Sequence, residues 1–337
     1  MAITTRRLGR YGPEVTAIGF GMMGISAYYG ATEPDEQRLK VLDHLYATGE
    51  RFWDTANVYG DSEILIGKWF ALNPEKRKDI VLATKFGNLG QGKARNDPEF
   101  AKESLMKSLE RLQTNYVDVF YVHRINYETP IEVTVQGMVD LLNQGLVRHL
   151  GLSEVSATTL RRAHAIHPIA AVQMEYSPFS LEIEMPETNL LETCRELGVA
   201  VVAYSPLGRG ILTGQIKGPE DFEAGDFRIN IPRFSAENFP KNLQLVATLE
   251  KVGARKGATA AQVVLAWLLK QWEMVIPIPG TKRIKYYDEN MGGLRVSISD
   301  EDDIEIRTAV EAAAITADRY PTGWDRSLFA NTAPQAM

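Results

Sequence analysis

Four polar side chains in this sequence combine residue types that can move a proton. Asp54, Tyr59, Lys85 and His123 stand at or just after the ends of three successive short apolar segments. The carboxyl ends of parallel strands in a barrel face one rim, so we expect these side chains to meet there. A single ion pair or a single tyrosine at a strand end is usually structural. Four polar residues on three strand ends indicate a chemical site instead.

The chemistry that suits these four residues is the protonation of a carbonyl oxygen. A phenol has an ordinary pKa of about 10, and a cation beside it stabilises the phenolate and lowers that pKa. We expect Lys85 to be this cation, Asp54 to hold the ammonium charged and in place, and His123 to orient a carbonyl by hydrogen bonding. Tyr59 can then protonate the oxygen while hydride reaches the carbon.

Strands and helices alternate along nearly the whole sequence, and they must position this site. Short runs rich in valine, isoleucine and aromatic residues are each followed by a segment whose apolar residues recur every three or four positions. Eight strands bordered by amphipathic helices predict an α/β fold, a single (β/α)8 TIM barrel. The expected strands are residues 15–20, 51–54, 80–85, 117–123, 147–153, 171–175, 199–204 and 275–277.

The chain has 337 residues, more than the roughly 250 of a typical barrel, and the surplus falls in identifiable segments. Residues 6–15 read as an N-terminal β-hairpin that plugs the barrel floor. The irregular stretch 206–240 and the tail after residue 300 are expected to be long loops at the C-terminal face. No break in composition marks a linker, so we expect residues 1–337 to form one domain.

The composition excludes some partners and locations. The chain has 37 Lys and Arg against 43 Asp and Glu, a net charge of −6, so nucleic-acid binding is not expected. Residues 15–32 are uncharged but rich in glycine and polar residues, and residues 1–10 do not resemble a signal peptide. We therefore expect no membrane association and a cytoplasmic location, which the single cysteine also favours.

Cysteine and histidine predict no further chemistry. Cys194 lies at helical spacing from Leu190 and Leu197, so we expect a core residue rather than a nucleophile. No metal site is predicted, because the remaining histidines lack a second ligand at suitable spacing: His44, His149, His164 and His167.

A glycine motif at residues 19–24 leaves a different fold open. Gly19, Gly21 and Gly24 match the dinucleotide fingerprint G-x-G-x-x-G. In a Rossmann fold a helix starts at the third glycine and an acidic residue follows about 20 residues later, whereas here Asp54 comes 30 residues after Gly24. A loop at the barrel mouth is the favoured interpretation, and a Rossmann-type dehydrogenase remains an alternative.

Seven short motifs at the expected strand ends resemble those of the aldo-keto reductases, and the resemblance spans roughly residues 7–319. The pair Ser153-Glu154 and residues 318–321 also resemble the branch of pyridoxal reductase-like and perakine reductase-like enzymes. The motifs are FWDTANVYG at 52–60, ATK at 83–85, VHR at 122–124, GLS at 151–153, VQ at 172–173, YSPLGRG at 204–210 and IPGTK at 278–282.

The resemblance implies an NADP-dependent oxidoreductase that reduces a small-molecule aldehyde or ketone to an alcohol. Tyr59 is the implied acid, Lys85 and Asp54 tune it, and His123 positions the carbonyl. The sequence specifies neither the particular carbonyl compound nor the oligomeric state. A regulatory subunit that binds NADPH without turnover remains an alternative, although long partner-binding insertions are not evident.

The same resemblance implies where NADPH/NADP+ binds. Ser153 and Gln173 hold the carboxamide, Tyr204 stacks on the nicotinamide, and residues 205–210 cover the pyrophosphate. Thr281 and Lys282 bind the 2′-phosphate. The alternative interpretation of this basic run is a solvated charged surface. The full predicted set is Gly21, Met22, Ser153, Gln173, Tyr204, Ser205, Leu207, Gly208, Arg209, Gly210, Gly280, Thr281, Lys282, Glu289 and Asn290.

Three positions depart from the pattern of many family members. Glu154 replaces an asparagine, and a carboxylate cannot donate a hydrogen bond to the carboxamide oxygen. Gly280 replaces a lysine and Tyr286 an arginine, so Lys282 and its neighbour Arg283 must supply the phosphate contacts. Six large side chains could line the substrate pocket or simply pack: Met22, Met23, Tyr28, Tyr29, Trp324 and Phe329.

Overall fold

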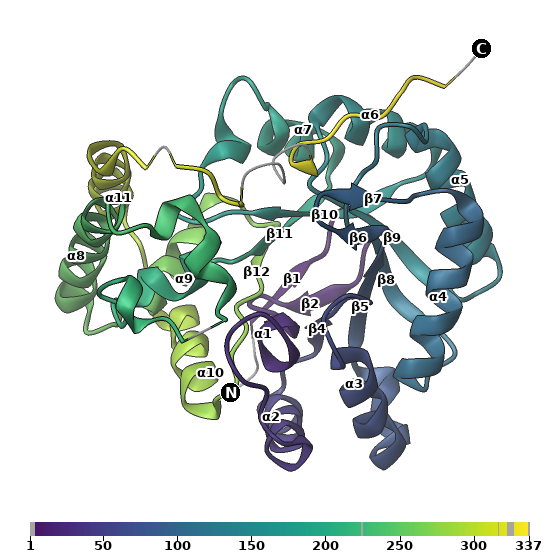
Figure 1. Ribbon diagram of the computed structural model, residues 1–337, viewed down its shortest axis with the longest axis horizontal. Coiled ribbons are helices and arrows are strands. Elements are labelled where there is room, and N and C mark those ends of the chain that lie inside the picture. The colour runs from purple at the N-terminus through teal and green to yellow at the C-terminus, as the bar shows by residue number, and fades with distance from the viewer. Residues whose placement is uncertain (1–3, 224, 316, 322–326, 336–337) are drawn as a thin grey trace.

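Eight parallel strands curl into a barrel at the centre of the molecule, with helices outside it (Figure 1). The computed structural model describes residues 4–223, 225–315, 317–321 and 327–335. The strands pair side by side in chain order, as a chain of strand–helix–strand crossovers requires. They are β3 (Phe20–Gly21), β4 (Phe52–Asp54), β5 (Val81–Phe86), β8 (Val117–Val122), β9 (Val147–Ser153), β10 (Ile169–Glu175), β11 (Ala200–Tyr204) and β12 (Val275–Pro277).

The first and last strands also join, which closes the barrel. Gly19 N donates to Pro277 O at 3.0 Å, and Gly21 N donates to Pro279 O at 3.2 Å. A Cβ on Gly280 would lie 2.3 Å from Gly21 O, so this close approach of two backbones requires glycine. Consecutive strand order and closure are those of a TIM barrel, so the Rossmann alternative for the glycine motif is wrong.

Helices cover the outside of the sheet between successive strands. Asp97 and Ser156 cap two of them, because their side chains accept hydrogen bonds from Phe100 N and Thr159 N. The helices are α1 (Met23–Ser26), α2 (Asp35–Thr48), α3 (Ser62–Leu72), α4 (Pro98–Leu112), α5 (Ile131–Asn143), α6 (Ala157–Ile166), α7 (Leu190–Leu197), α8 (Phe239–Lys256), α9 (Ala260–Gln271), α10 (Ile284–Met291) and α11 (Asp300–Ala313).

Three of these helices, α1, α8 and α11, are additions to the barrel plan. α8 and α11 lie side by side at one edge of the molecule (Figure 1), where Arg255 forms ion pairs with Asp302 and Glu305. A small hairpin of β6 (Asn88–Gly90) and β7 (Lys93–Ala94) follows β5. The long stretch after β11 consists of short 3-10 turns: η3 (Gly208–Thr213), η4 (Pro219–Asp221), η5 (Phe227–Asn230) and η6 (Pro232–Phe234).

The N-terminal hairpin is confirmed, whereas the expected strand 15–20 is wrong. β1 (Thr5–Arg7) pairs antiparallel with β2 (Glu14–Thr16), and the chain then leaves this hairpin before it enters the barrel at Phe20. Leu8 and Val15 are buried in the cluster inside the barrel, so the hairpin plugs the floor. One apolar run therefore serves two elements, since Val15 fills the floor and Phe20 begins the wall.

One apolar layer fills the inside of the barrel and another lies between the strands and the helices, because alternate side chains along a strand point to opposite faces. On β8, Val119 and Tyr121 face the interior, while Phe120 and Val122 face the helices. Strands covered on both faces read as continuous apolar runs, as they do in this sequence. Among the described residues, no helix is both long and apolar enough to cross a membrane.

Candidate active site

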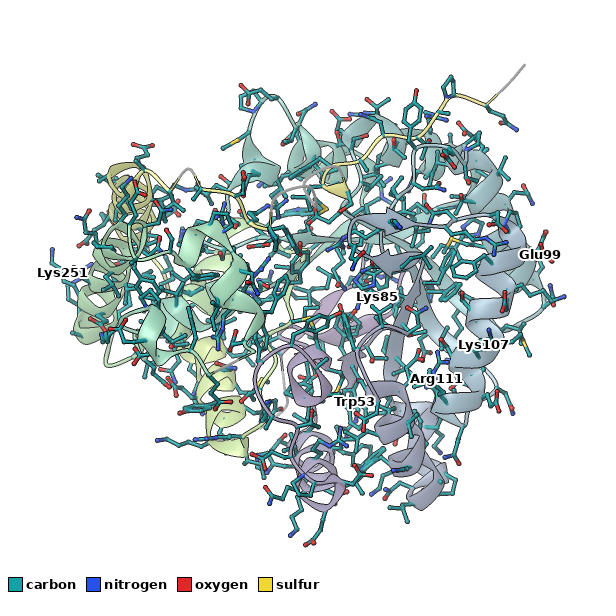
Figure 2. The ribbon with its side chains drawn as sticks, viewed as in Figure 1. Trp53, Lys85, Glu99, Lys107, Arg111 and Lys251 are labelled. Carbon is teal, nitrogen blue, oxygen red and sulfur yellow. The ribbon has the colours of Figure 1, made fainter. Side chains whose placement is uncertain are left out.

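The inward-facing side chains become polar at the carboxyl ends of the strands. Lys85 Nζ forms an ion pair with Asp54 Oδ1 and donates to Thr55 O at 2.7 Å. Gln173 Nε2, from β10, donates to Asp54 Oδ2 at 2.8 Å. Lys85 lies near the centre of the barrel (Figure 2) and is fully buried. Burial raises the pKa of Asp54 and lowers that of Lys85, and the ion pair opposes both shifts.

Tyr59 lies on the loop between β4 and α3, directly above this ion pair. Its hydroxyl is 3.5 Å from Lys85 Nζ and 3.5 Å from His123 Nε2. The rings of Tyr59 and His123 meet edge to face, with centroids 5.5 Å apart. Gly60 makes the loop possible, because its φ is 56° and a Cβ there would lie 2.7 Å from Ser26 O. The structure thus brings the four sequence-predicted catalytic residues together.

Burial dominates the electrostatics of the phenol and the imidazole. Burial, reinforced by the Asp54 carboxylate, raises the pKa of Tyr59 well above its usual range. Burial, with Arg124 and Lys85 acting in the same direction, lowers the pKa of His123 well below its usual range. The net lowering of the Tyr59 pKa that the sequence led us to expect is therefore not found in the protein alone, because burial and the Asp54 carboxylate outweigh the effect of the nearby cations. The phenol keeps its proton and the imidazole is neutral at pH 7.

A cavity of about 540 Å³ runs from Tyr59 across the barrel mouth to α10, and most of the predicted cofactor residues line it. This volume is ordinary for a small-molecule site. Ser153 instead borders a second cavity, which shares Tyr59, Gln173 and Tyr204 with the first. The predicted residues on the larger cavity are Gly21, Gln173, Tyr204, Ser205, Leu207, Arg209, Gly210, Gly280, Thr281, Lys282, Glu289 and Asn290.

Two predicted cofactor residues do not reach either cavity. The Met22 side chain is fully buried in the outer core. Its backbone N–H donates a hydrogen bond to Asp54 O at 2.8 Å. The next residue, Met23, begins α1 and lines both cavities instead. Gly208 is buried in the turn η3, with a φ of 56°, where it shapes the segment that carries Leu207 and Arg209.

Lys282 bridges the larger cavity near its outer end. Its Nζ donates to Tyr29 O and, at 2.6 Å, to Ala31 O, so it ties the loop after β12 to the loop between α1 and α2. Arg283 and Tyr286 line the same region. The basic run is thus part of the cavity wall, where its ammonium and guanidinium groups can meet an anion.

Glu154 points into the protein and lies outside both cavity linings. It is fully buried, with a φ of 50°, and its carboxylate accepts from Tyr204 Oη at 2.8 Å. It also forms an ion pair with Arg319 of the C-terminal tail at 3.2 Å, and Arg319 reaches Glu175 at 3.5 Å. Glu154 therefore anchors the tail to the end of β9.

The second cavity, of about 90 Å³, adjoins Tyr59 and His123. Tyr28 and Tyr29 line it, whereas Phe329 packs against the core and Trp324 lies outside the described residues. Four further residues line this cavity. Arg124 and Tyr320 belong to motifs visible in the sequence, VHR at 122–124 and residues 318–321, whereas Asn88 of β6 and Phe227 of η5 carry no signal there.

Cys194 is buried in the outer core, and burial raises the pKa of its thiol to about 12, which disfavours the thiolate that a nucleophile requires. The described part of the chain contains no group of three or more side chains arranged to hold a metal ion.

Comparison with known proteins places these features in context. The model of the Aldo/keto reductase family matches residues 17–311. The aldo-keto reductase str7 of Strobilurus tenacellus is 54% identical over 95% of both chains. The aldo-keto reductase yakc [NADP(+)] of Schizosaccharomyces pombe is 46% identical over 99% of both chains. The solved thermostable aldo-keto reductase Tm1743, in complex with the inhibitor epalrestat, aligns over 91% of this chain and 100% of its own, with a TM-score of 0.74 and 29% identity.

Proposed function

Because the chain belongs to the aldo/keto reductase family, whose members carry out NADP(H)-dependent carbonyl reduction, we propose that it reduces an aldehyde or ketone to an alcohol with Tyr59 as the proton donor. The observation that carries this proposal is the position of the Tyr59 hydroxyl. It lies 3.5 Å from both Lys85 Nζ and His123 Nε2 and borders both cavities.

The residues of the larger cavity fit NADPH. Its lining combines the backbones of Gly21 and Gly280 with two cationic side chains, Lys282 and Arg283. Tyr204 offers a ring beside Gln173, whose amide can bond a carboxamide while it also holds Asp54. Bound NADPH supplies a hydride, with its electron pair, to the carbonyl carbon.

The protein's own groups supply the proton and hold the carbonyl. His123 is neutral and can donate from Nε2 to the carbonyl oxygen, while the Tyr59 phenol donates from the other side. As hydride arrives, negative charge grows on that oxygen, and the proton passes from Tyr59 Oη to it. Lys85, 3.5 Å away, stabilises the phenolate that remains until it takes a proton back from solvent.

The test is NADPH oxidation with a panel of aliphatic and aromatic aldehydes. Tyr59→Phe removes the transferable proton and leaves the ring, so kcat should fall by about 10²- to 10⁴-fold. Binding of NADPH, followed by tryptophan fluorescence, should persist in this variant.

Tyr127→Phe is the matched control, because Tyr127 is 67% exposed. Equal kcat values for wild type and Tyr59→Phe would contradict the role of Tyr59 as the proton donor. Stoichiometric copurification of a partner, with no turnover on any carbonyl, would instead favour the regulatory subunit that binds NADPH without turnover.

A further inference from the structure

Arg124 places a positive charge in the wall of the second cavity. It follows His123 at the end of β8, and the cavity that it lines also contains the Tyr59 ring. Its guanidinium bonds three oxygens that carry no charge. Nη1 donates to His123 O at 2.8 Å and to Ser153 Oγ at 3.5 Å, and Nη2 donates to Tyr320 Oη at 3.1 Å.

Arg124 forms no ion pair with a described residue, and the Glu154 carboxylate, which pairs with Arg319, acts on its charge only at longer range. The neighbouring arginines do form ion pairs, since Arg209 pairs with Glu175 at 3.1 Å and Arg319 pairs with Glu154 at 3.2 Å. A guanidinium has five N–H hydrogens, and the three bonds above leave two of them, including that on Nε, for a further acceptor. A partly buried charge without a partner is unfavourable, so an anionic ligand here gains more than it would in water.

The rest of this cavity is suited to a compact anion with an apolar body. Among the described residues no aspartate or glutamate lines it, and its second cation, Arg209, is already paired. Tyr28, Tyr204 and Phe227 supply aromatic walls. Burial disfavours the charge of Arg124, but its neighbours Tyr320, Tyr204 and Glu154 keep its pKa above the ordinary value, so it is a cation at any working pH.

We propose that the preferred substrate carries a carboxylate as well as its carbonyl group. Arg124 binds the carboxylate, while Tyr59 and His123 hold the carbonyl oxygen. The proposal rests on the proposed function and deepens it, because it names the substrate class. Reduction is balanced as before: the carbonyl gains a hydride from NADPH and the Tyr59 proton, and the carboxylate is unchanged.

The experiment compares charged and neutral forms of one scaffold. The substrates are 3- and 4-carboxybenzaldehyde and their methyl esters, with NADPH and four proteins: wild type, Arg124→Gln, Arg124→Lys and Arg7→Gln. In wild type, kcat/KM for the better acid should exceed that of its ester by about tenfold or more, the usual size of a charge-assisted hydrogen bond. Arg124→Gln should bring this ratio close to one, chiefly through KM of the acid.

Arg124→Lys keeps the charge and should retain part of the preference. Arg7 is exposed on the floor hairpin and forms no side-chain bond to another described residue, so Arg7→Gln should keep the full ratio. A wild-type ratio of one or less for both acids, or a preference that survives in Arg124→Gln, would overturn the proposal. If Arg124→Gln fails to fold, the acid-to-ester ratio of kcat/KM in wild type still tests whether a carboxylate is preferred.

Benzoate binding, measured by calorimetry on the protein saturated with NADP+, separates this proposal from the proposed function. If no aldehyde is reduced but benzoate binds and Arg124→Gln abolishes the binding, the anion site stands and the reductase function fails. If the aldehydes are reduced and benzoate binds wild type and Arg124→Gln equally, the reductase function stands and the anion site fails.

Discussion

Removal of Arg319 should destabilise the C-terminal side of the barrel mouth. This tail residue is 6% exposed. It forms ion pairs with Glu154 at 3.2 Å, with Glu175 at 3.5 Å and with Glu182 at 3.4 Å. In Arg319→Met the apolar stem stays, but Glu154 becomes a fully buried carboxylate whose remaining side-chain partner is the Tyr204 hydroxyl.

The expected size of the effect follows from these contacts. Breaking a buried ion pair by removing one partner costs about 3 to 5 kcal/mol. Glu175 keeps its ion pair with Arg209 at 3.1 Å, so the variant leaves mainly Glu154 without a cationic partner. We therefore expect a loss of stability at the lower end of that range. Replacing the stranded carboxylate as well, in Glu154→Gln/Arg319→Met, should restore about 2 kcal/mol, because residues in one network couple by amounts of this order.

The measurement is the free energy of unfolding in urea at pH 7 for wild type, both single variants and the double variant. Arg161→Met is the matched control, since its ion pair with Glu196, between α6 and α7, is exposed at both ends and should contribute less than about 1 kcal/mol. Two results would refute the reasoning. One is an Arg319→Met protein within about 0.5 kcal/mol of wild type, and the other is a double variant less stable than either single variant.

Two further predictions concern the cofactor and a buried acid. Lys282→Ala should raise KM for NADPH about tenfold and change KM for NADH much less, because only NADPH carries a 2′-phosphate; unchanged NADPH affinity would show that Lys282 does not meet that phosphate. Burial raises the pKa of Glu50 to about 8, so between about pH 5 and pH 8 the folded protein holds a proton that the unfolded chain has released. Wild-type stability should therefore fall by up to about 1.4 kcal/mol per pH unit over that window, and Glu50→Gln should flatten this slope; parallel stability–pH curves for the two proteins would contradict the assignment.

The sequence predicted the site residues whose position follows from the local order of side chains along a strand. Asp54, Lys85 and Gln173 occupy strand ends, and the period of two along each strand sends their side chains inward. The same logic failed for residues 15–20, because an apolar run does not reveal whether the barrel wall or the floor hairpin buries it. The cytoplasmic location and the organisation of residues 1–337 as one domain stay predictions.

Contacts between distant segments were beyond the sequence. Glu154 was expected beside the nicotinamide, and it turns instead to Arg319, which lies 165 positions away along the chain. Met22 and Met23 are indistinguishable by type, and only the start of α1 decides that Met23 borders the cavities. The position of Arg124 after His123 could be read from the sequence. Whether Arg124 forms an ion pair depends on where the acidic side chains lie in the folded protein.

The sequence by itself determined the fold class, the family and the four residues of the proposed catalytic group, because strand ends and their side-chain alternation are local properties of the chain. Only the tertiary structure decided the charges around that group. The burial that raises the pKa of Tyr59 and the paired or unpaired state of each arginine arise when segments far apart in sequence pack over one cavity. Desolvation and ion pairing act over a few ångströms of space, and the order of residues does not encode those distances directly.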